Sequence, residues 1–282
     1  MAAETQDSEA PITIGVIGAK GRMGRAIADE LWQGQGPVLG GLAVRAGDVD
    51  LGVTAETALG LDGCSSVQLS TVGDLPADLD ALIDFSSSAA LAENLSFARQ
   101  HGLPLLIGTT GLDANADMAI NKAAADIPLI LAANTSLGIN LLLDTVRRLS
   151  AALPPDLADI EILEMHHGGK RDAPSGTALA LGKAAAAGRE QPLREVQKLS
   201  REGDTGIRPE GEIGFATLRG GDVAGEHTVI FATPGERIEV THRCTDRAVF
   251  ARGAVRAARW LADRKGQPGK YSMADVLGLS GG

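Results

Sequence analysis

A glycine-rich turn near the start of the chain is the first feature whose residue spacing suggests chemistry. Gly18, Gly21 and Gly24 follow the apolar run ITIGVI at 12–17 and open a segment with helical apolar spacing at 22–33. In such a strand–turn–helix unit, glycines allow the close approach of a pyrophosphate, whose charge the helix N-terminus attracts. The GxxGxxG spacing departs by one position from GxGxxG, and an ordinary strand-to-helix turn is the alternative. We expect a dinucleotide to contact Gly18, Ala19, Lys20, Gly21, Arg22 and Met23.

The end of the next apolar run indicates which dinucleotide is preferred. A NAD site usually carries Asp or Glu there to hold the ribose 2′-hydroxyl, whereas this chain reads Ala43-Val44-Arg45. A cation without a carboxylate suits a 2′-phosphate, so NADPH is favoured over NADH. Lys20 and Arg22 either add to this phosphate site or are solvated turn residues. Two later strand ends carry small residues that would let a nicotinamide ring lie against the backbone: Gly108, Thr109 and Thr110, and then Ala132, Ala133, Asn134 and Thr135.

A basic, histidine-bearing segment lies in the middle of an otherwise acidic chain. Two histidines, a lysine and an arginine fall within 166–171, shortly before an Ala-rich helical segment that begins near Gly176 and Thr177. The first N–H groups of a helix have no intrahelical partner and attract anions, so the segment could receive a carboxylated substrate. Adjacent residues on a strand point to opposite sides, so we expect no shared metal, but one histidine as proton donor and the other as substrate contact. The alternative is a solvated basic turn followed by a simple helix cap.

The elements that must position these residues alternate along the first half of the chain. Short apolar runs predict strands at 12–17, 38–44, 81–85, 104–108 and 128–132, and helical spacing predicts helices at 22–33, 89–101 and 114–125. Strands that are apolar on both faces and joined by helices indicate a parallel sheet covered on both sides.

The second half has a different pattern. We predict a helix at 139–152, an antiparallel set of strands at 160–165, 195–199, 213–219, 226–232 and 237–242, a helix at 177–187, and a last helix at 248–264. The fold class is therefore α/β, with a Rossmann-like dinucleotide-binding domain (1–136 with 246–282). The second domain (137–245) is a mixed α/β domain with an open, largely antiparallel sheet.

Composition limits the class of partner. The 282 residues include 26 basic and 36 acidic side chains, a net charge of -10, which argues against nucleic-acid or anionic-membrane surfaces. Cys64 and Cys244 are far apart and form no CxxC motif, which favours neither a disulfide framework nor a zinc site. The polar N-terminal segment is unlike a signal peptide, so we expect a reducing, cytoplasmic location.

Several motifs together resemble one enzyme family, the 4-hydroxy-tetrahydrodipicolinate (dihydrodipicolinate) reductases of the diaminopimelate route to lysine. The motifs are GAKGRMGR at 18–25, IDFS at 83–86, IGTTG at 107–111, AANTSLGIN at 132–140, EILEMHHGGKRDAPSGTAL at 161–179, SREGDTG at 200–206, IGFATLRGGDVAGEHTVIF at 213–231 and TH at 241–242. The family often reads HHRHK where this chain has HHGGK at 166–170. Many members carry an acidic residue where this chain has Val44, and a basic residue is common where it has Ser86-Ser87-Ser88.

The resemblance implies a reaction and roles for particular residues. It implies NAD(P)H-dependent reduction of a cyclic dicarboxylic imine to tetrahydrodipicolinate with loss of water, in a homotetramer built by the second domain and without a metal. It also implies that His166 is the catalytic proton donor, that Lys170 is a second donor, and that His167, Gly176 and Thr177 bind the substrate carboxylates.

Other dehydrogenase classes fit the sequence less well. A short-chain dehydrogenase needs Tyr-x-x-x-Lys, but the single tyrosine, Tyr271, is followed four residues later by Asp275. A semialdehyde dehydrogenase needs a nucleophilic cysteine near the domain junction, whereas Cys64 is expected in an early loop and Cys244 at the end of a strand. A reductase of another carboxylated substrate and a non-catalytic NADPH-binding sensor stay open as alternatives.

Overall fold

The chain divides into two compact units, each with its own sheet. The computed structural model describes residues 11–279, so most of the N-terminal segment considered above for a signal peptide lies outside it. The first unit runs to Thr135 and includes Phe250–Val276, and the second consists of Ser136–Val249 with the residues from Leu277 onward.

The first unit contains a seven-stranded parallel sheet in the order β12-β6-β5-β4-β1-β2-β3. Its strands are β1 (Thr13–Ile17), β2 (Val38–Ala43), β3 (Leu69–Ser70), β4 (Ala81–Asp84), β5 (Leu105–Ile107), β6 (Pro128–Leu131) and β12 (Gly269–Tyr271). The order 3-2-1-4-5-6 is that of doubly wound dinucleotide-binding domains, and β12 extends it at one edge. The predicted parallel sheet is therefore confirmed.

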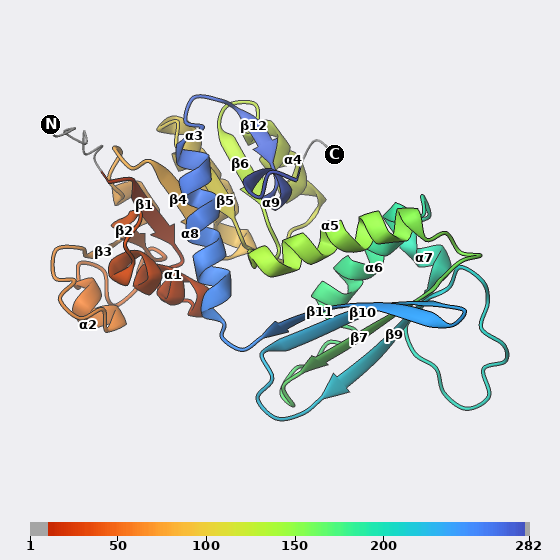
Figure 1. Ribbon diagram of the computed structural model, residues 1–282. Coiled ribbons are helices and arrows are strands. Elements are labelled where there is room, and N and C mark those ends of the chain that lie inside the picture. Colours follow the sequence, from red (N-terminus) through yellow and green to blue (C-terminus); the bar gives the residue numbers. More distant parts are fainter. Residues whose placement is uncertain (1–10, 280–282) are drawn as a thin grey trace, which may run out of the picture. The chain divides into compact units, whose positions relative to one another are not determined.

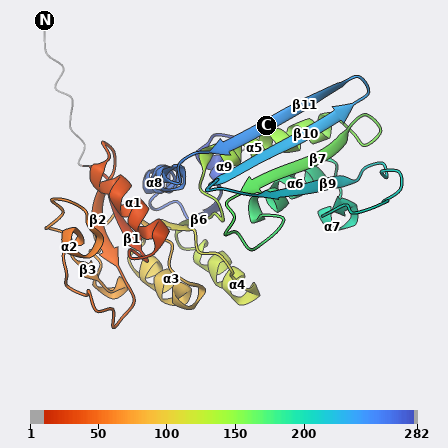
Figure 2. The same cartoon turned by 90° about the horizontal axis from the view of Figure 1, so that it is seen from below.

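Helices cover both faces of this sheet because its strands are apolar on both sides. Figure 2 shows α1 and α8 on one face and α3 and α4 on the other. The helices of the unit are α1 (Arg22–Gln33), α2 (Ala55–Leu59), α3 (Leu91–Gln100), α4 (Ala114–Ala123), most of α8 (Ala248–Ala262) and α9 (Met273–Val276), with 3₁₀ turns at Val72–Asp74 and Ser88–Ala90. The sequence prediction missed α2, β3, β12 and α9, which are too short to show a period.

The second unit is a five-stranded sheet in the order β11-β10-β7-β9-β8, with α5 and α6 packed on one face (Figure 1). Its strands are β7 (Asp159–His166), β8 (Gln197–Lys198), β9 (Ile213–Arg219), β10 (Gly225–Thr233) and β11 (Glu236–Cys244). Its helices are α5 (Leu137–Ala152), α6 (Gly176–Gly188) and α7 (Leu193–Val196).

Two predictions for the second unit need correction. The sheet is mixed: β10 pairs antiparallel with β7 and β11, but β9 pairs parallel with β7 and β8. The chain returns from β7 to β9 through α6, and a helical crossover of this kind makes the joined strands parallel. The strand predicted at 195–199 is also wrong in its first part, because Pro192 starts the one-turn helix α7 and leaves only β8 extended.

Close packing fixes the glycine turn before α1. A Cβ atom on Gly24 would lie 2.1 Å from the carbonyl oxygen of Gly18, a contact that no side-chain rotation can relieve because the oxygen belongs to the backbone and the backbone fixes the Cβ position. Gly24 therefore sets how closely α1 approaches the end of β1. A Cβ atom on Gly36, by contrast, would meet nothing within 4 Å.

We predict that Gly24→Ala lowers the free energy of unfolding by about 1–3 kcal/mol, the usual cost of overpacking. Gly36→Ala, which adds the same methyl group, is the matched control and should leave stability unchanged or slightly higher. Urea unfolding followed by circular dichroism measures both variants. Equal stability of Gly24→Ala and the unsubstituted protein would contradict the packing argument.

Candidate functional site

A cavity of about 330 Å³ lies at the carboxyl ends of the central strands of the first unit. In doubly wound sheets this is the edge where ligands bind. Four residues predicted to contact a dinucleotide line it, namely Gly18, Lys20, Gly21 and Arg45. Of the other predicted contacts in the turn, Ala19 is fully buried, while Arg22 and Met23 stand outside the lining.

The glycine turn has the geometry of a phosphate-binding loop. Gly18 has a φ of +84°, which a side chain would strain, and a Cβ atom there would lie 2.6 Å from the Phe85 carbonyl oxygen. The N–H groups of Gly18 and Ala19 both donate to the Ala43 carbonyl, at 2.9 and 3.1 Å. Gly21 is the N-cap of α1 and offers no side chain to its N–H groups. The turn and the cavity beside it therefore fit a dinucleotide pyrophosphate.

The charges around the cavity differ from those expected in one respect. Lys20 Nζ forms ion pairs with Asp48 Oδ1 at 2.7 Å and Asp50 Oδ2 at 2.6 Å. The hydrogen bond with Asp48 raises the pKa of Lys20, and the same bond lowers the pKa of Asp48. The sequence analysis missed Asp48, which lies beyond the strand end and lines the cavity. Arg45 is exposed and forms no ion pair within residues 11–279.

A buried carboxylate holds the loops beside this cavity in place through hydrogen bonds. Asp84, with no exposed surface, accepts hydrogen bonds from Ser86 N at 2.8 Å, Ser86 Oγ at 2.6 Å, Asn94 Nδ2 at 2.9 Å and Thr109 Oγ1 at 3.4 Å. These bonds connect β4 with α3 and with the loop after β5. A Cβ atom on Gly108 would lie 2.1 Å from the Phe85 ring, so the loop after β5 packs directly on that ring.

The later strand ends, predicted to border the nicotinamide, do not line the cavity. Thr109 is buried against Asp84, and the Thr135 hydroxyl donates to the Phe250 carbonyl at 2.7 Å, so the fold uses both side chains. Ala132 is buried and Asn134 is half-buried, while Thr110 and Ala133 are exposed.

The second unit carries its polar cluster on the face of β7 that packs against the helices. Ile160 and Ile162 are buried on this face, and the same alternation buries Glu164 and His166. Across the sheet, Glu164 lies opposite Thr217 of β9 and His227 of β10, and His227 lies opposite His242 of β11. The sheet face that packs against the helices therefore changes from apolar to polar toward the carboxyl end of β7.

Glu164 and His166 form the centre of this cluster. His166 Nδ1 lies 2.5 Å from Glu164 Oε2, and Arg219 donates to both carboxylate oxygens at 2.9 Å. Burial alone raises the pKa of Glu164, but its bonds with Arg219 and His166 outweigh that effect and hold the pKa below the usual value. Glu164 is therefore an ionised carboxylate at neutral pH.

A second histidine packs against the first. The His227 and His166 rings meet edge to face with centroids 5.1 Å apart. His227 Nε2 lies 3.1 Å from Ser175 Oγ, which also accepts from Ala178 N–H as the N-cap of α6. Burial, and then the neighbouring His166, lowers the pKa of His227 to about 4. His227 is therefore neutral at physiological pH.

The residues predicted for substrate and catalysis lie around this cluster. His167 N–H donates to the Val223 carbonyl at 2.8 Å, and Lys170 Nζ forms an ion pair with Asp172 at 2.9 Å. Ser175 N–H donates to Glu164 Oε1 at 3.0 Å, which places the N-cap of α6 beside the carboxylate. Gly176 and Thr177 are the first two residues of this helix. The structure thus brings His166, Lys170 and the α6 N-terminus to the same end of the sheet.

The pKa of His166 reflects opposing influences. Burial lowers it most, Glu164 acts in the opposite direction, and the charges of Lys170 and Arg219 lower it further, with a net decrease. A bound dianion would offset these cations and raise the proton affinity of the ring. The proton affinity of His166 therefore depends on the charges beside it.

The sequence analysis missed several residues at or near the cavity of the first unit and in the polar cluster of the second unit. They are Asp48, Asp84, Asn94, Glu164, Arg219 and His227. One signal was available in the alternation of the strands. Glu164 follows Ile160 and Ile162 on one face of β7, and His227 shares a face of β10 with Val229 and Phe231. A charged or polar residue on an otherwise apolar strand face indicates a partner inside the fold.

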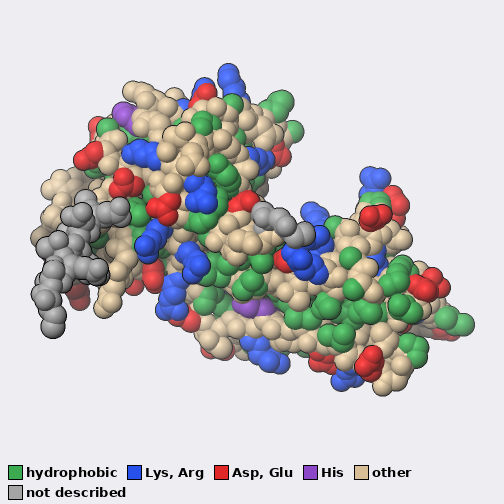
Figure 3. Space-filling model, turned by 45° about the horizontal axis from the view of Figure 1, so that its top comes forward, with side chains coloured by type: hydrophobic (Ala, Val, Ile, Leu, Met, Phe, Trp, Pro, Cys, Tyr) green, Lys and Arg blue, Asp and Glu red, His purple; other side chains and the backbone are tan. Residues whose placement is uncertain are grey.

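Clusters of metal ligands and membrane-spanning helices are absent from the part of the chain that the structure describes. No group of three His, Cys, Asp or Glu side chains suited to a metal ion occurs in residues 11–279. None of the described helices is both long and apolar enough to cross a membrane. Figure 3 shows basic and acidic side chains interspersed on the visible face.

Comparison with known proteins gives consistent matches along the chain. Residues 12–135 match the family model described as dihydrodipicolinate reductase, N-terminus, and residues 138–277 match the model described as its C-terminus. A 4-hydroxy-tetrahydrodipicolinate reductase of Afipia carboxidovorans is 49% identical over 265 residues, which cover 94% of this chain and 96% of the relative. One of Zymomonas mobilis is 48% identical over 271 residues, or 96% and 99% of the two chains.

A solved structure supports the fold. Dipicolinate-bound dihydrodipicolinate reductase from Paenisporosarcina sp. TG-14 superposes with a TM-score of 0.72 at 20% identity, covering 94% of this chain and 99% of that one. Both halves of the sequence match the two models of one family, and relatives bearing that family's name align over nearly their whole length. The chain therefore belongs to the dihydrodipicolinate reductase family.

Proposed function

We propose that this protein reduces 4-hydroxy-tetrahydrodipicolinate to tetrahydrodipicolinate with NAD(P)H, in the diaminopimelate route to lysine. The observation that carries the proposal is the buried Glu164–His166 pair, which lies beside Lys170 and the N-terminus of α6 in a chain whose two halves match this reductase family. The rival function of a non-catalytic sensor would have no need for a proton donor of this kind.

The residues of the second unit account for the proton and for substrate binding. His167, Gly176 and Thr177 bind the two carboxylates of the cyclic imine, and the α6 N-terminus adds favourable charge. The dinucleotide, when bound, supplies the hydride. His166 then delivers the proton that the reduced, electron-rich substrate must receive, and Lys170 acts as a second donor.

The residues of the first unit hold the dinucleotide. The Gly18–Gly21 turn receives the pyrophosphate. The other contacts with the dinucleotide come from Ala19, Lys20, Arg22 and Met23, and from the strand ends at 108–110 and 132–135. Because Lys20 is already paired with Asp48 and Asp50, Arg45 is the cation that we assign to a ribose 2′-phosphate, and NADPH is the favoured cofactor. No metal takes part in the proposed reaction.

We also propose that the enzyme is a cytoplasmic homotetramer assembled through the second unit. The sheet face opposite α5 and α6 carries Leu218, which is 48% exposed, with Leu163, Met165 and Ile230 half-buried around it. Such an apolar sheet face suits an interface between copies of the chain. The free, buried thiols of Cys64 and Cys244 are compatible with a reducing compartment.

The reaction is tested by a coupled assay in which the upstream synthase makes the substrate from pyruvate and aspartate semialdehyde. We expect absorbance at 340 nm to decay only when the synthase is present, and faster with NADPH than with NADH at low cofactor concentration. Binding of NADPH without synthase-dependent oxidation would instead favour the sensor or another carboxylated substrate.

His166→Gln should lower kcat by about 10²–10⁴-fold, the usual contribution of a positioned general acid, and leave the Kd for NADPH within about twofold. Steady-state kinetics and quenching of protein fluorescence by the cofactor measure the two quantities. Parallel losses of turnover and cofactor affinity would show that His166 acts on the fold and does not donate the proton.

Arg45→Ala should raise the Kd for NADPH by about 10–100-fold, the value of a charge-assisted hydrogen bond, and leave the Kd for NADH almost unchanged. Arg194→Ala, at an exposed arginine of α7 in the second unit, is the matched control. If both cofactors lose affinity equally, the assignment of the 2′-phosphate to Arg45 is wrong.

A further inference from the structure

The Glu164 carboxylate is buried far more completely than its charge alone would allow. Only 1% of the residue is exposed, and burying an ionised carboxylate is unfavourable unless donors surround it. Five donors do so: His166 Nδ1, Ser175 N, Thr217 Oγ1 and the two terminal nitrogens of Arg219. Four of these satisfy the charge without the histidine, which leaves the 2.5 Å contact with His166 to be explained.

This contact fixes which nitrogen of His166 carries the proton. An ionised carboxylate only accepts hydrogen bonds, so Nδ1 bears a hydrogen in both the neutral and the charged ring. Nε2 is then the atom that gains and loses the proton. A Cβ atom on Gly225 would lie 3.1 Å from Nε2, so the glycine leaves room at that edge of the ring.

Among the titratable and charged groups around His166, Glu164 is the one that stabilises the protonated ring. Glu164 lies on the same strand, Arg219 faces the ring from β9, His227 from β10, and Lys170 from the loop that follows β7. His227 is neutral, and both Arg219 and Lys170 oppose a positive charge on His166. Without Glu164, the charged groups that act on the ring would be the cations Lys170 and Arg219, beside the neutral His227.

We infer that Glu164 is a positioning residue for the reduction, which orients His166 through Nδ1 and stabilises its protonated form, so that Nε2 delivers the proton. The inference rests on the proposed function, because it assigns a partner to the donor of that reaction. Glu164 is 1% exposed and acts on the reaction through His166, while its bonds with Ser175, Thr217 and Arg219 hold it in the fold. Removing its charge should therefore alter the proton-transfer step more than substrate binding.

Glu164→Gln keeps the size of the side chain and one oxygen but removes the charge. We expect kcat to fall about 10–100-fold, as when other groups that orient a functional histidine are removed, with KM changing less than about threefold. The donor must be protonated, so kcat falls as pH rises past the His166 pKa. Loss of the neighbouring negative charge lowers this pKa, and the basic limb of the kcat profile should move at least about one unit toward lower pH.

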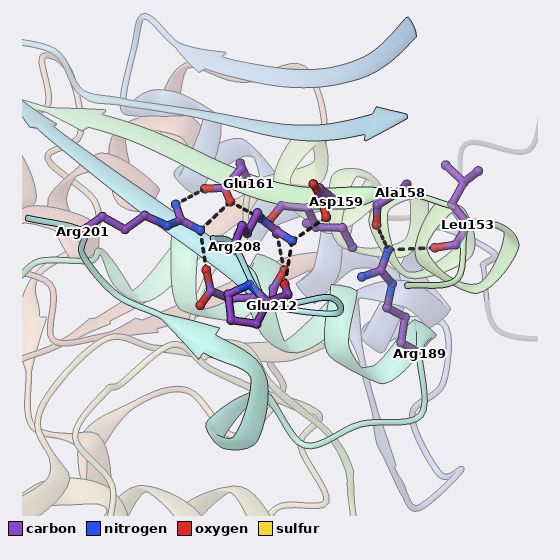
Figure 4. A network of polar contacts seen from close by, with 10 residues as sticks. Leu153, Ala158, Asp159, Glu161, Arg189, Arg201, Arg208 and Glu212 are labelled. Atoms are coloured by element: carbon purple, nitrogen blue, oxygen red, sulfur yellow. Dashed lines mark hydrogen bonds and ion pairs between the residues drawn. The ribbon is translucent and has the colours of Figure 1, made fainter. Parts of the chain in front are cut away.

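The matched control is Glu161→Gln, at a carboxylate on the same strand and the opposite face. Glu161 pairs with Arg201 Nη1 and Nη2 at 2.8 Å and with Arg208 Nε at 3.1 Å (Figure 4), so its loss also breaks a network of ion pairs. We expect the basic limb to stay in place in this variant. An unmoved limb in Glu164→Gln, or an equal shift in Glu161→Gln, overturns the inference.

A measurement on the unsubstituted protein covers the case in which Glu164→Gln does not fold. Two-dimensional ¹⁵N NMR distinguishes protonated from bare ring nitrogens, and the His166 signals are those missing from His166→Gln. The neutral ring should carry its hydrogen on Nδ1 and have a bare Nε2, whereas a hydrogen on Nε2 would overturn the inference. This readout needs no turnover, so the two failures are distinguishable: a failed coupled assay refutes the proposed reaction, whereas a hydrogen on Nε2 refutes the orientation of His166 by Glu164.

Discussion

A buried carboxylate must be surrounded by donors, and this requirement shapes the second unit. Glu164 is matched by groups that lie 2, 11, 53 and 55 residues away: His166, Ser175, Thr217 and Arg219. They come from β7, from the N-cap of α6 and from β9, so one charge determines how three elements meet. Arg219 also donates to the Asp172 carbonyl at 2.7 Å, which ties the loop after Lys170 to the same carboxylate. The polar end of the sheet is therefore built around Glu164, and the proposed proton donor lies within that frame.

The first unit also has a buried carboxylate surrounded by donors, and it lies beside the cavity. Asp84 ends β4 and is fully buried, with donors from the following loop, from α3 and from the loop after β5. Phe85, the next residue, packs its ring on Gly108 and its carbonyl group on Gly18. Asp84 thereby holds the loops that border the glycine turn, although the carboxylate itself does not line the cavity. In both units the charge that organises the site lies behind the residues expected to contact ligands. Such charges keep contact residues in place in an environment where a misplaced polar group costs free energy.

The sequence predicted what depends on local periodicity and missed what depends on register. Alternating apolar runs and helical spacing located β1, β2, β4, β5, β6 and most helices, and the glycine spacing located the turn at Gly18. The partners of Glu164 could not be predicted, because the alignment of β7 with β9 and β10 decides which residues face it. The parallel direction of β9 follows from the crossover through α6, a helix that the sequence did predict, but the turn residues between the strands suggested antiparallel pairing. Asp48 escaped notice because a loop, and not a strand end, brings it to the cavity.

The two packed histidines show why one of them, and not the other, suits proton donation. Their ring centroids are 5.1 Å apart, and both lie in the same buried layer, so burial alone disfavours charge on either. His166 contacts a carboxylate, whereas the closest polar partner of His227 is the neutral hydroxyl of Ser175. A proton on His227 would be repelled by a charged His166, and the pKa of about 4 keeps His227 neutral at physiological pH. Neighbouring groups with separated pKa values commonly divide the work of a catalytic site, one changing its protonation and the other keeping it. The neutral His227 thus supports the ring of His166 without competing for its proton.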